Sequence, residues 1–392
     1  MARALFLFNH DSAHQVAHLA PIAGALAEEH PHVTTQIAYS SGQIRDRIES
    51  LIEPKIMERI EWHELSLSGV TGYVTQYLDR ILPASRLARL RKHEGVLSQS
   101  DAVISTERTC LRVADRLDGT RIPLFIRVPH GTGDRSVTFH PDHRRFDLSL
   151  VAGPKMKRQL IEHGIAPEKI LVTGYAKFEQ IDLNSKPNYF DNERPTFVYN
   201  PHFDPHLSSW YTMGPDVLRW FASKSGQSYN LIFAPHVMLF RKSVHVSPEY
   251  KIAKSRPDIP AEIAHADNIL IDVDGPSLFD MSYMLAADAY IGDASSQLYE
   301  FLVRPRPVIL LDQEGWLQDQ GQACLPFLET GPAVRNISEM QRAVSDHASL
   351  AERYRDVQRT LIADTFAFGK TPPSSRGARA IADAITKRKL GK

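Results

Sequence analysis

Three histidines directly follow prolines at the ends of short apolar runs. The pairs are Pro129-His130, Pro201-His202 and Pro235-His236. In an open parallel sheet, ligands bind in the loops beyond the carboxyl ends of the strands, so histidines that recur at strand ends favour a functional site. A histidine can act as a general base near neutral pH. The alternative is that each histidine is a structural residue, which is the commoner role of a lone histidine.

The loop that carries His130 has glycines at positions 131 and 133. Glycine lets the backbone approach a ligand closely or adopt positive φ. We therefore interpret His130 as a general base, and we expect Gly131 and Thr132 to lie against the donor substrate. A tight turn with a hydrogen-bonded histidine is the other interpretation of this segment.

A fourth apolar run, residues 289–292, leads into Asp293-Ala294-Ser295-Ser296. Ser295 and Ser296 are good N-caps for a helix predicted over residues 297–303. The free N–H groups at its start would bind phosphate, and Glu300, on the face opposite the apolar stripe, would accept hydrogen bonds from ribose hydroxyls. The pattern predicts a nucleoside diphosphate site that includes Asp293. A capped helix with a surface glutamate is the alternative.

Short β-rich runs alternate with longer amphipathic segments along the whole chain, which indicates parallel sheets covered by helices on both faces. A polar segment with two prolines, residues 182–195, is the best linker. We predict a Rossmann-like acceptor-side domain over residues 1–185, a Rossmann-like donor-binding domain over 186–370, and a terminal helix or tail over 371–392 with a solvated surface. The predicted strands are residues 4–8, 33–39, 101–105, 124–128, 148–151, 170–173, 196–200, 230–234, 268–272, 289–292 and 308–311, and the predicted helices include 13–29, 41–60 and 154–163.

Composition excludes several classes of protein. The 392 residues exceed one ordinary core, and 43% hydrophobic with 23% charged residues is typical of a soluble globular chain, not a disordered or coiled-coil one. Lys+Arg and Asp+Glu are both 46, which argues against a nucleic-acid binder. Two distant cysteines, Cys110 and Cys324, suggest a reducing compartment. With no secretion signal or long apolar span, we expect a cytoplasmic protein that can contact the inner face of the plasma membrane.

Three further groups of residues have more than one interpretation. His202, Asp204 and His206 alternate and could hold a metal in an extended loop, although we expect neither a metal nor a cofactor. The basic segment 86–92 follows apolar positions and could lie on anionic lipid, or it could be a solvated helix. A third group follows the first predicted strand and comprises His10, Asp11, His14 and His18. The sequence does not tell which of these four side chains reach substrate. His18 is a candidate for the ligand cleft, as are His202 and Asp204.

The chain resembles the CDP-glycerol glycerophosphotransferase family of teichoic-acid primases and polymerases, which have the GT-B fold. The resemblance covers about residues 100–370. It rests on PHGTGD at 129–134, on APHVMLFRK at 234–242, and on the segment 278–312 with its Asp-x-Ser-Ser turn. GYAKF at 174–178 matches another family motif more loosely.

This resemblance implies transfer of a polyol phosphate from a CDP-activated donor to a hydroxyl of a glycan or lipid-linked acceptor, with release of CMP. His130 would take the hydroxyl proton, and His236, with Arg241, would stabilise charge on the transferring phosphate. The amides of Ser295 and Ser296 would hold the diphosphate. Alternatives are a GT-B glycosyltransferase that uses a nucleotide sugar, a nucleotide-sugar 2-epimerase and, least favoured, a binding module without activity. Nucleic acid is not an expected partner.

Overall fold

The computed structural model describes residues 1–10, 13–67, 69, 75, 79, 84–117, 122–134, 139–247, 250–315 and 326–391. The chain divides into two units, residues 1–181 with 363–392, and residues 182–362. The first predicted limit, at residue 185, lies close to the observed boundary at 181, whereas the second, at 370, lies after the observed boundary at 362. Residues 363–392 return to the first unit, where their apolar side chains find a core, instead of forming a separate tail.

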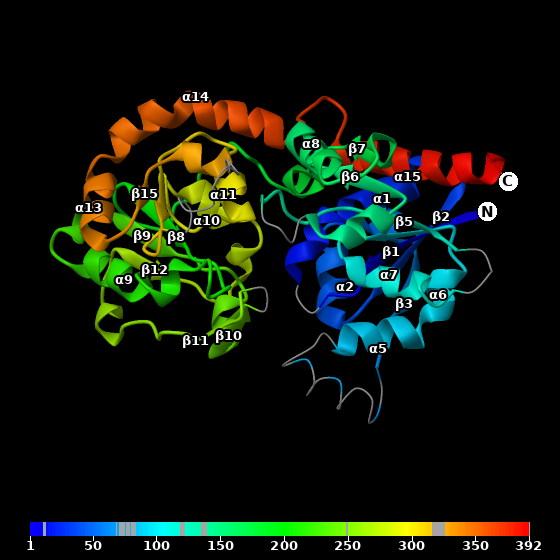
Figure 1. Ribbon diagram of the computed structural model, residues 1–392, viewed down its shortest axis with the longest axis horizontal. Coiled ribbons are helices and arrows are strands. Elements are labelled where there is room, and N and C mark those ends of the chain that lie inside the picture. The colour runs from blue at the N-terminus through cyan, green and yellow to red at the C-terminus, as the bar shows by residue number, and fades with distance from the viewer. Residues whose placement is uncertain are drawn as a thin grey trace. The chain divides into compact units, whose positions relative to one another are not determined.

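Unit 1 is built on a parallel sheet whose strand order is β3-β2-β1-β4-β5-β6-β7 in the described residues (Figure 1). Chain order reverses at β1, so the topological switch point, where ligands bind in such sheets, lies between β1 and β4. The strands are β1 (Ala2–Phe8), β2 (Val33–Tyr39), β3 (Glu61–Glu64), β4 (Ala102–Ser105), β5 (Leu124–Arg127), β6 (Leu148–Val151) and β7 (Ile170–Val172).

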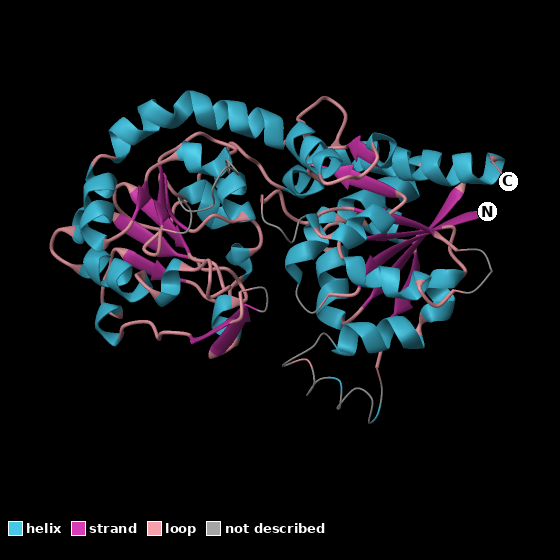
Figure 2. Ribbon diagram, viewed as in Figure 1, coloured by secondary structure: helices cyan, strands magenta, loops and turns pink. Residues whose placement is uncertain are grey.

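Both faces of this sheet are buried, as the near-continuous apolar runs predicted. Phe6 and Phe8 of β1 belong to one core cluster, and Leu5 and Leu7 belong to a second cluster on the opposite face. Figure 2 shows the strands inside and the helices outside. The helices of unit 1 are η1 (Ala13–His18), α1 (Ala20–Glu29), α2 (Gly42–Glu49), α3 (Pro54–Met57), α5 (Ala84–Lys92), α6 (Glu94–Ser98), η2 (Arg108–Cys110), α7 (Leu111–Ala114), η4 (Pro141–Arg145), α8 (Pro154–Glu162), η5 (Pro167–Lys169), η6 (Ala176–Gln180) and α15 (Pro373–Leu390).

Two predicted helices are broken in the structure. The helix predicted over 13–29 is the 3₁₀ helix η1 followed by α1, with Pro21 in the first turn of α1. The helix predicted over 41–60 is α2 and α3, because Pro54, which has no N–H to donate, opens a new helix instead of continuing the first. The edge strand β3 follows and was not predicted.

Unit 2 has a parallel sheet with the order β12-β9-β8-β13-β14-β15 in its described part, so its switch point lies between β8 and β13. An antiparallel hairpin, β10 with β11, was not predicted. The strands are β8 (Thr196–Asn200), β9 (Asn230–Phe233), β10 (Val244–Ser247), β11 (Ile252–Ser255), β12 (Ile269–Ile271), β13 (Ala289–Gly292), β14 (Val308–Leu311) and β15 (Ala333–Val334). The helices are η7 (Ser209–Tyr211), α9 (Gly214–Ala222), η8 (Gly226–Ser228), η9 (Leu239–Arg241), η10 (Ala261–Ile263), η11 (Pro276–Leu278), α10 (Ser282–Ala286), α11 (Ser296–Phe301), η12 (Pro326–Thr330), α13 (Ile337–Ser345) and α14 (His347–Thr365), the last of which ends in unit 1.

The terminal helix α15 corrects the expectation of a solvated surface helix. Its inner face, which includes Ala378, Ile381 and Ile385, is buried in the core of unit 1. A Cβ added at Gly377 would lie 3.2 Å from atoms of the Ile22 side chain in α1, so the two helices approach closely. Figure 1 shows α15, in red, beside α1. No helix among the described residues has the length and apolar character needed to cross a membrane.

We predict that Ile381→Ala destabilises the protein by about 2–5 kcal/mol, because the fully buried side chain would leave a cavity. Calorimetric unfolding of the variant measures the loss. Arg379→Ala, an exposed position on the same helix, is the control and is expected to leave unfolding unchanged. Equal behaviour of the two variants would contradict the packing of α15.

Candidate functional site

His130 lies in the loop after β5, and the structure brings two other histidines to it. The rings of His14 and His18 lie with their centroids 6.2 Å and 6.4 Å from that of His130. The buried His18 ring also packs edge-on against Tyr175, at 4.9 Å. Tyr175 belongs to the loosely matching segment 174–178, which therefore contributes to this histidine cluster.

Both His18 and His130 favour the neutral form. Burial lowers the pKa of His18 well below its usual value, and the charges of Lys177 and His130 add to this. The surrounding protein removes hydration and lowers the pKa of His130 to about 4, although the carboxylate of Glu107 opposes the shift. Since solvent still reaches His130, water screens part of this effect. At neutral pH the His130 ring can therefore accept a proton.

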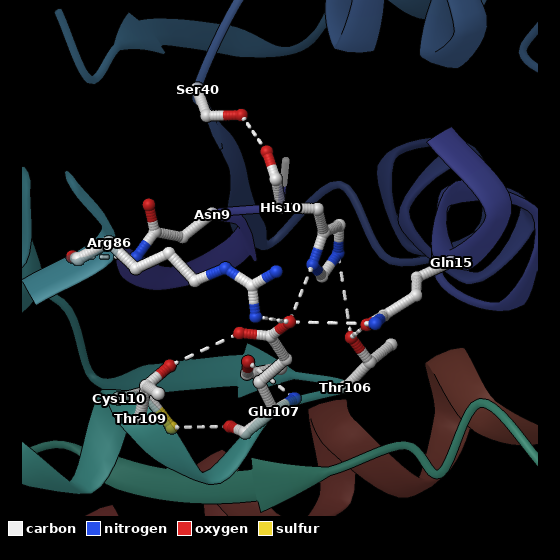
Figure 3. Close-up of polar contacts among 10 residues, drawn as sticks. Asn9, His10, Gln15, Ser40, Arg86, Thr106, Glu107, Thr109 and Cys110 are labelled. Carbon is white, nitrogen blue, oxygen red and sulfur yellow. Dashed lines mark hydrogen bonds and ion pairs between the residues drawn. The ribbon is translucent and has the colours of Figure 1, made fainter. Parts of the chain in front are cut away.

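Glu107 follows β4 and is the centre of a buried polar network at the switch point of unit 1 (Figure 3). One carboxylate oxygen, Oε1, accepts a hydrogen bond from Arg86 at 2.8 Å and lies 3.4 Å from Nδ1 of His10. Burial alone would raise the pKa of Glu107, but the hydrogen bond and charge of His10, with the charges of Arg86 and His130, outweigh burial and hold it at about 2. Glu107 is therefore an ionised, buried carboxylate.

The same network holds the ring of His10 in place. The Thr106 hydroxyl donates to Oε1 of Gln15 at 2.6 Å and lies 3.4 Å from Nε2 of His10. Figure 3 shows the His10 ring between Glu107 and Thr106. Both ring nitrogens of His10 therefore face polar side chains that follow β4.

The loop that contains Gly131 and Thr132 is anchored to α8. Lys155 donates to the backbone carbonyl of Thr132 at 3.0 Å and to the carboxylate of Asp134 at 2.9 Å. Gln159, one turn later, donates to the same Asp134 oxygen at 2.8 Å. Burial lowers the pKa of Lys155, and Asp134 opposes this shift. The ion pair thus fixes the loop without occupying His130.

In unit 2 the neighbouring strands β9 and β8 carry His236 and His202 at their carboxyl ends. The two rings lie 5.0 Å apart, and the His236 amide donates to the carbonyl of Pro201 at 2.9 Å. His202 is buried and His236 is half-buried. The structure thus brings together two of the three histidines that the Pro-His pairs singled out.

Backbone hydrogen bonds indicate the tautomer of both rings. The amide of Asp204 donates to Nδ1 of His202 at 3.0 Å, and the amide of Met238 donates to Nδ1 of His236 at 3.2 Å. Since Nδ1 accepts in each case, the neutral ring carries its proton on Nε2. Both Nε2–H groups are therefore hydrogen-bond donors, which suits them to an anion and not to proton abstraction.

Asp293, after β13, connects the loops that follow β13 and β8, the two strands of the second switch point. Its carboxylate accepts from the amide of His202 at 2.6 Å and from the amide of Ser209 at 3.0 Å. These bonds hold the loop that carries His202. The geometry therefore gives Asp293 a positioning role in addition to the predicted contact with the donor.

The segment after Asp293 forms α11 as predicted, but the helix spans six residues and ends at Phe301. Its macrodipole is accordingly small, and anion binding must rely on individual amides. Ser295 caps the helix by accepting from the Gln297 amide at 3.2 Å. Within the described part of the chain, no hydrogen bond engages the amides of Ser295 and Ser296. These two N–H groups are available to a ligand.

Glu300 is buried, so the interpretation as a surface glutamate is wrong. It lines a small recess with Gln297, Met281 and Tyr283. Met281 adopts a left-handed conformation with φ of 67°, a strained state for a residue with a side chain, and such strain is common near functional sites. The carboxylate thus borders a recess next to the strand-end loops of unit 2.

The alternating residues of segment 202–206 do not converge as metal ligands. Nδ1 of His202 accepts from the backbone, Asp204 accepts from the amide of His206 at 3.0 Å, and the His206 ring stacks on Tyr250. The loop turns instead of running extended, which separates the side chains. Over the residues that the structure describes, no group of three His, Cys, Asp or Glu is arranged to hold a metal.

Two other predicted groups are arranged differently from the expectation. The basic helix α5 turns Arg86 toward Glu107 and buries Arg89, so only its last cations, Arg91 and Lys92, face outward. Arg241 is exposed and contacts the sulfur of Met238. Asp11 and Cys324 lie outside the described residues, as do the apolar positions before the basic segment, which are Tyr77, Leu78, Ile81 and Leu82.

Sequence reasoning missed Glu107, Arg86 and the central position of His10. The segment Ser105-Thr106-Glu107 ends a predicted strand, so the rule that was applied to four other strand ends would have found Glu107. Arg86 gave no signal, because it lies 21 residues from its partner and seemed to belong to a surface helix.

Comparisons with solved structures identify the type of fold. The wall teichoic acid polymerase TagF matches 98% of this chain and 89% of its own with a TM-score of 0.58 at 12% identity. S. aureus MnaA in complex with UDP (13% identity) and a UDP-N-acetylglucosamine 2-epimerase (10%) match all of this chain and 97% of theirs, each with a TM-score of 0.60. The fold is of the GT-B type. No protein-family model matches the sequence, and the search of curated proteins found no match.

We predict that Glu107→Gln destabilises the GT-B fold at pH 7 by on the order of 3 kcal/mol, since the folded pKa lies about 2.5 below the usual 4.5. A lowered pKa gives stability that is present above pH 4.5 and is lost as pH falls toward 2. The difference in unfolding free energy between wild type and variant, measured by urea unfolding, is expected to become smaller as the pH is lowered from 7 to 3. Glu49→Gln, from the exposed pair with Arg45, is the control. A gap that is constant with pH would refute the ionised, paired Glu107.

Proposed function

We propose that this protein transfers a polyol phosphate, such as glycerol phosphate, from a CDP-activated donor to a hydroxyl of a glycan or lipid-linked acceptor and releases CMP. The observation that carries the proposal is the pair of fixed Nε2–H donors, His202 and His236, next along the sheet to the free amides of Ser295 and Ser296. Together they offer several N–H groups at one edge of the sheet, which suits a diphosphate.

In this proposal unit 2 binds the donor. The amides of Ser295 and Ser296 hold the diphosphate, and Nε2–H of His236 donates to the transferring phosphate. Glu300 in its recess accepts from the ribose hydroxyls. Asp293 keeps the His202 loop in place, and the exposed Arg241 adds positive charge nearby.

Unit 1 supplies the base and binds the acceptor. The acceptor oxygen forms a bond to the distal phosphorus, the bond between that phosphorus and the bridging oxygen breaks, and CMP leaves with the electron pair. His130 takes the hydroxyl proton and becomes an imidazolium, which Glu107 stabilises. Gly131 and Thr132 lie in the loop that Lys155 anchors, so the base is held in position while the proton moves.

The similar structures support this proposal and a second one. TagF is a wall teichoic acid polymerase and was solved after a soak with CDPG. MnaA was solved with UDP, and 2-epimerases are similar at the same level, so an enzyme that acts on a nucleotide sugar is the second candidate. The His-Gly-Thr loop and the Asp-x-Ser-Ser turn favour the first. We place the protein in the cytoplasm with peripheral contact to the plasma membrane through surfaces such as Arg91 and Lys92.

We predict that His130→Ala lowers the turnover of CDP-glycerol about 10²–10⁴-fold, the usual contribution of a general base. Donor binding should be largely retained, because most of the assigned donor contacts belong to unit 2. Steady-state release of CMP and calorimetric binding of CMP give the two readings. His32→Ala, an exposed histidine of the same unit, is the control. Turnover near that of the wild type would end the assignment of the base.

We predict that Ser296→Pro, which removes the backbone N–H at the first position of α11 where proline is tolerated, and Glu300→Gln each weaken the binding of CMP or CDP-glycerol by about 10-fold, the effect of one hydrogen bond to a charged or ribose group. Glu300→Gln keeps the shape of the buried side chain, so folding is expected to survive. Isothermal calorimetry measures the affinity, and Glu314→Gln, an exposed glutamate of unit 2, is the control. Unchanged affinity in both variants would move the nucleotide site elsewhere.

A further inference from the structure

Arg127 is a buried cation at the carboxyl end of a central strand. It is the last residue of β5, with 6% of its surface exposed. Its partners across the sheet are Ser105 of β4 and Ser149 of β6, both buried and both uncharged. The strand neighbours therefore provide no counter-charge.

Among the described residues, no group of another element is a hydrogen-bond or ion-pair partner of the Arg127 guanidinium. Its buried Nη1 makes no hydrogen bond, and within the described part of the chain no acidic group forms an ion pair with it. Arginine is almost never buried without a partner, since an uncompensated buried charge costs several kcal/mol. In the described part of the protein, the positive charge of Arg127 therefore has no negative charge paired with it.

A second arginine has one buried nitrogen that makes no hydrogen bond. It is Nη1 of Arg108, in η2 after β4, although the residue as a whole is half-buried. Arg108 lies three residues after Ser105, the β4 residue that pairs with Arg127, so both cations lie at the carboxyl ends of neighbouring strands. Burial, with the charge of Arg108, lowers the pKa of Arg127 to about 10. Glu107, the adjacent residue in the chain, does not relieve them, because its carboxylate is held by Arg86 and His10.

We propose that Arg108 and Arg127 form a binding site for a phosphate-type oxyanion in unit 1, separate from the donor site assigned to unit 2. Two guanidinium forks match the charge and the tetrahedral oxygens of a phosphate monoester or pyrophosphate better than the single charge of a carboxylate. The site lies at the carboxyl edge of the sheet, where parallel sheets bind ligands. Arg108 is only half-buried, which gives the anion access from solvent.

The ligand of this site in the reaction is a phosphate group of the acceptor. This ligand assignment rests on the proposed function, since an acceptor for polyol phosphate transfer carries phosphates of its own when it is lipid-linked through a pyrophosphate or already extended. The binding of phosphate itself does not depend on the proposed function, because it follows from the two uncompensated guanidinium groups.

The test compares inorganic phosphate, glycerol 3-phosphate and CMP as probes, by calorimetry and thermal unfolding of the full chain, with sodium chloride at equal ionic strength as the salt control. We expect saturable binding of phosphate and glycerol 3-phosphate and a rise in Tm. Arg127→Met and Arg108→Gln should each weaken this binding at least 10-fold and leave CMP binding unchanged. Arg112→Gln, an exposed arginine of α7, should bind as the wild type does.

Stability without ligand separates binding from a structural role. Arg127→Met removes an uncompensated charge, so without phosphate its Tm should equal or exceed that of the wild type. A lower Tm, retained phosphate binding in both variants, or no saturable binding to the wild type would each overturn the proposal. Phosphate binding that depends on both arginines in a protein that binds no cytidine nucleotide would support the anion site and reject the proposed function.

Discussion

Each unit holds one buried carboxylate at the switch point of its sheet, and the arrangement of the histidines depends on how that charge is compensated. In unit 1, Glu107 is compensated by the side chains of Arg86 and His10. In unit 2, Asp293 is compensated by the backbone amides of His202 and Ser209. A carboxylate removed from water must accept such bonds, so the loops that donate them have little freedom.

This compensation separates two kinds of histidine. His202 and His236 each accept a hydrogen bond from a backbone amide at Nδ1, so Nε2–H of each ring is a donor. His130 is instead a neutral ring, and the charge of Glu107 stabilises its protonated form. Donors suit the charge of a phosphate, and a base suits the proton of a hydroxyl. The division of roles that the proposed phosphoryl transfer requires thus has a physical origin in each loop, and it does not need an extended helix dipole from the short α11.

Much of the fold was predictable from the sequence, because strands buried on both faces have continuous apolar runs that loops interrupt. The runs at 148–151, 289–292 and 308–311 match β6, β13 and β14 to the residue. The edge strand β3 was missed because Glu61–Glu64 is polar and half-exposed. The α15 packing was missed because its charged end resembles a solvated helix, while its buried stripe fits a core formed by distant residues.

The candidate site was predictable only where chemistry follows a strand directly. Pro-His pairs gave His130, His202 and His236, and the serine turn gave Ser295 and Ser296. The surroundings of these residues could not be predicted from the sequence. Only the folded sheet brings Glu107 together with Arg86 and His10, and Arg108 to the same sheet edge as Arg127. Partners that are distant in sequence leave no local pattern, and for that reason the burial of Glu300 was also missed.

The identity of the nucleotide product tests the account most directly. The purified protein is incubated with CDP-glycerol, CDP-ribitol and UDP-sugars, each with a glycan or lipid-linked acceptor, and the products are separated and followed by phosphorus NMR. The account predicts CMP from a CDP-polyol, with the distal phosphorus found in a new phosphodiester. Release of a nucleoside diphosphate from a sugar donor, or epimerisation of a UDP-sugar with no reaction of any CDP-polyol, would contradict it.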